Sequence, residues 1–131
     1  MKQGGKLAGG NPARGRAEND FYATHPDSTK ALLEVEKIIY PALEPACGEG
    51  HISKLIEDPS LVSTDLIYRG YGKGGIDFLS DNYLEKPYFG FETIITNPPF
   101  NLFQEFVEKA LEVANQKVIM FGKLQALEGQ N

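Results

Sequence analysis

The chain of 131 residues has the length of one domain, and its 41% apolar and 24% charged residues are typical of a globular protein. The formal net charge of -5 argues against a broadly basic nucleic-acid-binding surface, although net charge says little about one local groove. A single cysteine, Cys47, excludes an internal disulfide, and no apolar run reaches the roughly 18 residues of a membrane span. We therefore expect a cytoplasmic protein that has no membrane partner.

The N-terminal segment differs in composition from the rest of the chain. Residues 1–18 are rich in glycine and contain four basic residues, which predicts a flexible arm. Such an arm either contacts the phosphates of a nucleic acid or has no binding role. Residues 19–131 are expected to form a single domain.

The first helix and the first strand are predicted to overlap. Apolar residues recur at helical spacing from Pro26 to Ile39, and Pro26 and Asp27 are start signals for a helix. The apolar run 38–44 follows at once and predicts a buried strand that ends at Glu44. After the glycine turn at 48–50, Ile52, Leu55 and Ile56 indicate a short helix.

The remaining strands alternate with loops and one longer helix. Leu61–Asp65 predicts a second strand, Gly75–Phe78 a short third, Thr93–Thr96 a fourth and Val118–Phe121 a fifth. Residues 101–104 resemble a capping box that opens a helix. The apolar face of this helix is expected to contain Leu102, Phe103, Phe106, Val107, Ala110 and Leu111.

Alternating strands and helices predict an open, parallel α/β sheet of five strands in the order 3-2-1-4-5. In such sheets, ligands bind beyond the carboxyl ends of the strands, near the point where the strand order reverses. Three unusual sequences occupy those strand ends: Glu44–Gly50, Asp65 and Asn97–Phe100. We expect them to converge.

The first two of these sequences predict an adenosine-containing ligand. Gly48 and Gly50 allow a sharp turn close to a ligand, and Asp65 can accept both hydroxyls of a ribose. Ser53 occupies the third glycine position of the dinucleotide fingerprint, which disfavours a nicotinamide cofactor. A purely structural turn remains the alternative.

The third sequence, TNPPF at residues 96–100, predicts a rigid surface of hydrogen-bond acceptors. Prolines lack an N–H, so Asn97 and Pro98 can offer a side-chain and a main-chain oxygen to the two hydrogens of a planar amine. Phe100 can stack on the ring that carries this amine. Such acceptors direct the nitrogen lone pair toward an electrophile, and a methyl sulfonium is a suitable one. An ordinary turn after a strand is the alternative.

Five motifs in order resemble those of the S-adenosylmethionine-dependent N6-adenine DNA methyltransferases. They are FYATHP (21–26), EPACGEG (44–50), Asp65, DFL (77–79) and NPPF (97–100), and the tail MFGKLQALEGQN is similar to that of the phage and prophage enzymes. The resemblance implies an open Rossmann-like sheet of the class I methyltransferase type. It also implies a DNA partner, with the target adenine flipped out of the duplex, and a bacterial host cell. Since the family's sheet has further strands, the domain is expected to be truncated after the fifth strand, or completed by a partner or a second copy.

The resemblance also implies roles for individual residues. Tyr22 and Thr24 would hold the methionine carboxylate, Asp65 the ribose hydroxyls and Asp77 the adenine amine of S-adenosylmethionine. The full set of implied cofactor-binding residues is Tyr22, Thr24, Glu44, Pro45, Ala46, Cys47, Gly48, Gly50, Asp65, Leu66, Asp77, Phe78 and Asn97. The implied catalytic residues are Asn97, Pro98, Pro99 and Phe100.

Several alternatives remain open at this point. Cys47, His51 and His25 could form a metal site, but no fourth ligand is evident, so that we expect none. The aromatic and basic residues of the 68–73 loop could contact nucleic acid or simply be solvated. A guanine amine in RNA or a protein glutamine could replace adenine as the methyl acceptor. The chain could also be an inactive cofactor-binding fragment.

Overall fold

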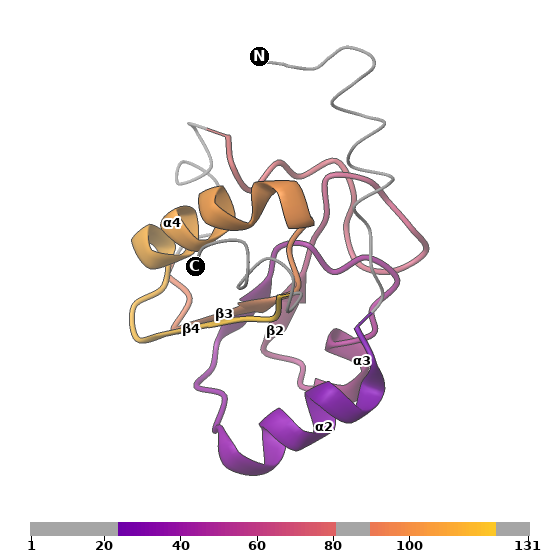
Figure 1. Cartoon of the computed structure of the whole chain (residues 1–131), viewed down its shortest axis with the longest axis vertical. Coiled ribbons are helices and arrows are strands. Elements are labelled where there is room, and N and C mark those ends of the chain that lie inside the picture. The colour runs from indigo at the N-terminus through magenta and orange to yellow at the C-terminus, as the bar shows by residue number, and fades with distance from the viewer. Residues whose placement is uncertain (1–23, 81–89, 123–131) are drawn as a thin grey trace.

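The computed structural model describes residues 24–80 and 90–122, and within these ranges the chain folds around a four-stranded parallel sheet (Figure 1). The strands are β1 (Ala42–Glu44), β2 (Leu61–Ser63), β3 (Thr93–Thr96) and β4 (Lys117–Met120), in the order β2-β1-β3-β4. The predicted arm and Tyr22 lie outside the described residues. An α/β fold with an all-parallel sheet is therefore established, and it is compatible with a Rossmann-like fold.

The two central strands are buried on both faces. Every residue of β1 and of β3 is buried, which explains why both read as uninterrupted runs rather than alternating ones. Leu43 stands at the centre of the register, since it pairs with Val62 of β2 and with Ile94 of β3. β3 pairs with β4 over four residues, from Thr93 opposite Lys117 to Thr96 opposite Met120.

Helices cover both faces of this sheet, so that the fold has three layers (Figure 1). Helix α4 (Phe103–Val113), preceded by the 3-10 turn η2 (Phe100–Leu102), lies over one face, and α2 (Pro26–Val35) and α3 (Ser53–Ile56) lie over the other. Successive residues of β3 supply the two cores. Ile94 packs with the buried side chains of α4, and Ile95 packs on the α2 and α3 side.

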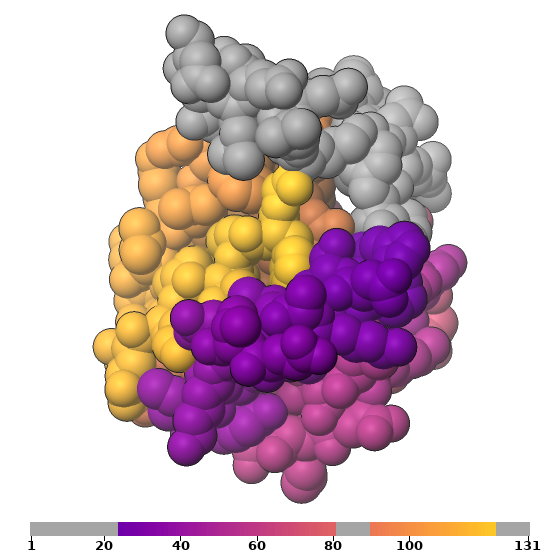
Figure 2. All heavy atoms as spheres, turned by 60° about the horizontal axis from the view of Figure 1, so that its bottom comes forward, coloured from indigo at the N-terminus to yellow at the C-terminus, as the bar shows by residue number. Residues whose placement is uncertain are grey.

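A polar contact attaches the end of α2 to the edge strand β4. Figure 2 shows α2 (indigo) beside the β4 segment (yellow). Lys117 Nζ lies 2.8 Å from Glu36 Oε1, and the same nitrogen donates to the carbonyl oxygen of Lys37 over 2.8 Å. Because both side chains are partly exposed, this ion pair adds little stability. Its main effect is to define where the chain leaves α2.

The predicted third strand at Gly75–Phe78 does not form, so that the order 3-2-1-4-5 is wrong. Gly75, the first residue of the predicted strand, has a positive φ of 74°, which is incompatible with an extended strand, and Gly70 and Gly72 before it also have positive φ values, of 99° and 70°. An isolated bridge between Thr64 and Lys73 joins this loop to the residue that follows β2. The other four predicted strands are present in the same relative order.

The two longer helices also differ from the prediction. Helix α2 ends at Val35, which is 80% exposed, and its buried side chain is the polar Thr29. Helix α4 begins after the turn η2, and its N-cap residue is Leu102, which makes no side-chain cap bond, rather than the predicted Asn101. The buried residues of α4 are Phe106, Ala110 and Val113, which follow the i, i+4, i+7 spacing of one helix face. Leu111 stands off this face and is 66% exposed, contrary to the prediction.

Across residues 24–80 and 90–122, none of the helices has both the length and the apolar character needed to span a bilayer.

Candidate functional site

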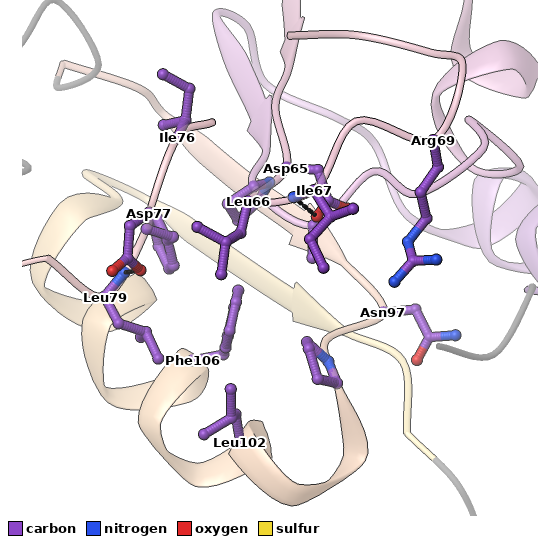
Figure 3. Close-up of a pocket in the computed structure, with 14 residues that line it drawn as sticks. Asp65, Leu66, Ile67, Arg69, Ile76, Asp77, Leu79, Asn97, Leu102 and Phe106 are labelled. Atoms are coloured by element: carbon purple, nitrogen blue, oxygen red, sulfur yellow. Dashed lines mark hydrogen bonds between the residues drawn. The ribbon is translucent and has the colours of Figure 1, made fainter. Parts of the chain in front are cut away.

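A pocket lies where the chain leaves the carboxyl ends of β1, β2 and β3 (Figure 3). It contains about 640 Å³ of empty space, counted out to the open solvent at its mouth. Its walls are mainly apolar and carry a few polar groups. The lining residues are Pro45, Ala46, Asp65, Leu66, Ile67, Arg69, Ile76, Asp77, Phe78, Leu79, Asn97, Pro99, Leu102 and Phe106.

The three predicted strand-end sequences do meet, but only some of their residues line the pocket. Pro45 and Ala46 come from the turn after β1, Asp65 and Leu66 from the end of β2, and Asn97 and Pro99 from the end of β3. Asp77 and Phe78 of the predicted DFL motif join them from the loop. Eight of the residues that the sequence suggested are therefore part of one site.

Asp65 connects the glycine turn to the end of β2. Its Oδ2 accepts a hydrogen bond from the backbone N–H of Gly48 over 2.8 Å, and its Oδ1 accepts from that of Ile67 over 3.0 Å. Gly48 has a φ of 56°, a conformation that a residue with a side chain adopts only at a cost. A carboxylate has about four acceptor positions, so that Asp65 retains capacity for the hydroxyl groups of a ligand.

Glu44, a predicted cofactor-binding residue, is not among the residues that line the pocket. It is 1% exposed, and its carboxyl group lies within the fold, 2.6 Å from Ser53 Oγ and 3.3 Å from Thr96 Oγ1. Burial raises the pKa of Glu44 to about 8, although the hydrogen bonds with Ser53 and Thr96 act in the opposite direction. Glu44 thus joins the turn after β1 to the residue that precedes Asn97.

Cys47, Gly48 and Gly50 form the turn itself without lining the pocket. Cys47 is buried with its Sγ 3.6 Å from the carbonyl oxygen of Tyr71, and burial, with the nearby Glu44 and Asp65 carboxylates, raises the pKa of its thiol to about 12. A Cβ on Gly50 would lie 2.6 Å from the ring of Tyr71. These glycine and cysteine positions therefore serve the close packing of the 71–72 loop against the turn.

The metal-site alternative receives no support from the part of the chain that the structure describes, where no three His, Cys, Asp or Glu residues lie close enough together to hold an ion. His25 has a different partner, since its Nδ1 accepts a hydrogen bond from the N–H of Asp27 over 3.1 Å. It is the N-cap of α2, a role in which histidine is uncommon and which the sequence did not reveal.

Asp77 occupies the side of the pocket opposite Asn97 (Figure 3), and Phe78, the next residue in the chain, also lines the pocket. The Oδ1 atom of Asp77 accepts from the N–H of Leu79 over 3.0 Å, which holds an exposed carboxylate at the rim. Phe78 is 2% exposed, and the centroid of its ring lies 5.3 Å from that of Phe106. This region can therefore present an apolar wall beside an acceptor.

Asn97 is oriented by the segment before α2. Its Nδ2 donates to Thr24 Oγ1 over 3.0 Å, and this contact joins positions that are 73 residues apart in sequence. The bond engages the donor end of the amide, so that the acceptor end, Oδ1, faces away from Thr24. Thr24 is buried and does not line the pocket.

The rest of the TNPPF sequence is divided between the pocket and the fold. Pro99 lines the pocket, and its carbonyl oxygen accepts from the N–H of Leu102 over 3.0 Å at the start of η2. Pro98 is buried and Phe100 is 38% exposed, and neither of them lines the pocket. A stacking role for Phe100 would therefore act at the outer surface.

Sequence reasoning missed several lining residues, of which Arg69 is the most informative. The sequence left the 68–73 loop as either a nucleic-acid contact or a solvated segment. In the structure Arg69 is half-buried and lines the pocket, with its guanidinium directed toward Asn97 (Figure 3).

Comparison of the chain with protein-family models, with curated proteins and with solved structures found no match. The functional argument therefore depends on the chemistry of this pocket.

Proposed function

We propose that the pocket binds S-adenosylmethionine and that the chain transfers the methyl group to the N6 amine of an adenine in DNA. The observation that carries this proposal is the meeting of Asp65, Asp77 and Asn97 in one pocket at the carboxyl ends of parallel strands. These are the residues to which the motif resemblance assigns the ribose, the cofactor's adenine and the target amine.

The acceptor groups of the pocket fit an adenosine ligand. A purine amine needs an acceptor beside an apolar surface, and Asp77 with Phe78 offers both. A ribose diol needs a carboxylate, and Asp65 lies between Asp77 and Asn97 in Figure 3. The apolar side chains of Leu66 and Ile67 can exclude water from the ligand between these points.

When bound, S-adenosylmethionine supplies an electrophilic methyl group on a positively charged sulfur. The chain's contribution is to hold an amine nitrogen against it with the lone pair correctly directed. Asn97 can accept one amine hydrogen through Oδ1, because its Nδ2 donates to Thr24. The motif resemblance assigns the second hydrogen to the carbonyl oxygen of Pro98, a buried residue that stands between the lining residues Asn97 and Pro99 in the chain. Both acceptors belong to a rigid segment, so that little reorganisation is needed during the reaction.

The direct test is to supply the complete 131-residue chain with methyl-labelled S-adenosylmethionine and to offer it duplex DNA, ribosomal RNA and protein substrates in parallel. The proposal predicts label in the adenines of DNA, and Asn97→Ala should prevent this labelling. Label in guanine or in glutamine would mean that the chain methylates a different planar amine by the same chemistry. Calorimetric binding of the cofactor without labelling of any substrate would identify a binding module that does not catalyse transfer.

A further inference from the structure

The charged residues of the pocket are arranged with opposite signs at opposite ends. Of the lining residues within the described ranges, three are charged: Asp65, Asp77 and Arg69. Figure 3 shows the Asp77 carboxylate on one side of the pocket and the Arg69 guanidinium on the other, above Asn97. The proposed chemistry gives the two aspartates a role and leaves the arginine without one.

The loop that carries Arg69 is held in place by backbone hydrogen bonds. The N–H of Lys73 donates to Ser63 O over 3.0 Å, and the N–H of Asp65 donates to Lys73 O over 2.9 Å. The N–H of Gly75 closes the loop by donating to Leu66 O over 3.1 Å. Arg69 therefore extends from a loop whose two ends are fixed to the end of β2.

An arginine in this setting is suited to an oxyanion. Its planar guanidinium donates two parallel hydrogen bonds to a carboxylate or a phosphate, and such charge-assisted pairs strengthen where water is partly excluded. Arg69 is half-buried, so that a ligand oxyanion here would be partly shielded from solvent.

We propose that Arg69 binds the α-carboxylate at the amino-acid end of the methyl donor, an inference that rests on the proposed function. With the purine at Asp77 and the ribose at Asp65, the amino-acid end extends toward Asn97 and Arg69. Thr24, to which the motif resemblance assigns this carboxylate, lies outside the lining and accepts a hydrogen bond from Asn97. Because Arg69 lines the same pocket as Asp65 and Asp77, the ligand oxyanion expected beside it is the carboxylate of the molecule that these two aspartates hold.

The test compares two ligands that differ only at the amino-acid end. S-adenosylhomocysteine carries the carboxylate, and methylthioadenosine retains the adenosine and the thioether without it. Isothermal titration calorimetry measures both ligands with the complete wild-type chain, with Arg69→Gln and with Arg69→Lys. Lys73→Gln is the matched control, because it removes the same charge from the same loop at an exposed side chain that does not line the pocket.

Arg69→Gln should weaken S-adenosylhomocysteine binding by about tenfold or more and leave methylthioadenosine binding within about twofold. Arg69→Lys keeps the charge without the planar guanidinium and should lose less affinity for S-adenosylhomocysteine. If Arg69→Gln does not fold, the comparison of the two ligands with Arg69→Lys tests whether Arg69 binds the carboxylate. Lys73→Gln should change neither affinity.

Three outcomes overturn the inference. An equal loss for both ligands would mean that Arg69 only supports the loop. Unchanged S-adenosylhomocysteine binding together with weaker binding of duplex DNA would mean that Arg69 meets a phosphate. If the wild-type chain binds neither ligand, the proposed function itself is wrong, which separates that failure from the failure of the Arg69 assignment.

Discussion

At the scale of single residues, the site depends on side chains that act indirectly as well as on those that face the pocket. Glu44 is buried beneath the turn after β1 and shares hydrogen bonds with Ser53 and Thr96. Asn97 is oriented by Thr24. The residues that line the pocket are thus held by an inner layer of polar groups, and each layer can be tested separately.

Replacement of Glu44 by glutamine should change how stability depends on pH. The pKa of Glu44 is raised from 4.5 to about 8, so that the folded chain holds this proton more tightly than the unfolded chain does. The stabilisation of the folded state that protonated Glu44 contributes is therefore complete below about pH 4.5, and it is lost as the pH rises toward 8. The free energy of unfolding of the wild type should fall across this window by an amount on the order of a few kcal/mol, and Glu44→Gln should lack that fall.

Urea denaturation at several pH values between 5 and 9 measures this difference. Glu49→Gln provides the control, because it removes an exposed glutamate from the same turn and should change stability by about 0.5 kcal/mol or less. Parallel pH profiles for the wild type and Glu44→Gln would show that Glu44 is ionised in the folded chain.

Thr24→Val tests whether the orientation of Asn97 matters for the chemistry. The substitution keeps the side-chain volume and removes the hydroxyl that accepts from Asn97 Nδ2. We expect methyl transfer to slow by about fivefold, since one neutral hydrogen bond is worth about 1 kcal/mol, while cofactor affinity stays the same. Asn97→Ala should abolish transfer and also spare cofactor affinity.

Thr29→Val is the control for that experiment. Thr29 is also buried, but its hydroxyl has no hydrogen-bond partner among the described residues and lies in α2, away from the pocket lining. Its replacement should leave the rate of transfer unchanged. If Thr24→Val and Thr29→Val have the same effect on the rate, the contact between Thr24 and Asn97 has no catalytic role.

At the scale of elements, the loop between β2 and β3 takes the place of the predicted third strand. It passes close to the turn after β1, where Gly72 lies against Ser63 and Cys47. This close approach brings the 65–79 segment over the ends of the strands, from which Asp65, Arg69 and Asp77 enter the pocket. The loop thus contributes more lining residues than a short strand would allow.

Gly72→Ala should therefore destabilise the chain more than Gly75→Ala. Both glycines have positive φ, 70° and 74°, so that each substitution carries a backbone cost of about 1–2 kcal/mol. At Gly72 the new Cβ would also lie 2.7 Å from Ser63 O and 2.8 Å from Cys47 Sγ, whereas at Gly75 nothing lies within 4 Å. Thermal unfolding measures the difference, and equal melting temperatures would contradict the close packing at Gly72.

At the scale of the whole molecule, the sheet and its two helical layers position the pocket at one edge. The core on the α4 side contains Phe78 and Phe106, which are also lining residues, so that the pocket is continuous with the core. The other core, around Ile52 and Ile95, supports the sheet from the opposite face. A ligand in the pocket would therefore stabilise the fold as a whole.

S-adenosylhomocysteine should raise the melting temperature of the chain. At a concentration of one hundred times its Kd, a ligand that binds only the folded state adds about 2.7 kcal/mol, which corresponds to several degrees for a domain of this size. Differential scanning fluorimetry measures the shift, with free methionine as the control that lacks the adenosine. A shift of the same size with methionine would contradict an adenosine site.

The sequence alone determined most of the layout of this chain. β3 was predicted at Thr93–Thr96, as observed, because a central parallel strand is buried on both faces and reads as a continuous apolar run. The meeting of the turn after β1, Asp65 and Asn97 also followed from the sequence, since parallel strands end at one edge of a sheet. The first feature depends on a local sequence pattern, and the second depends on the parallel arrangement of the strands.

Only the tertiary structure decided which of those residues enter the pocket. Glu44 and Asn97 both stand at the ends of buried strands, yet one points into the fold and the other lines the pocket. Thr24 acquired its place through a contact with Asn97, 73 residues away in the sequence, which no local pattern records. Arg69 lines the pocket together with residues from the ends of β1 and β3, which the sequence of its own loop does not reveal. The positive φ of the loop glycines converted a predicted strand into a pocket wall, because backbone conformation at glycine is set by packing rather than by a side chain.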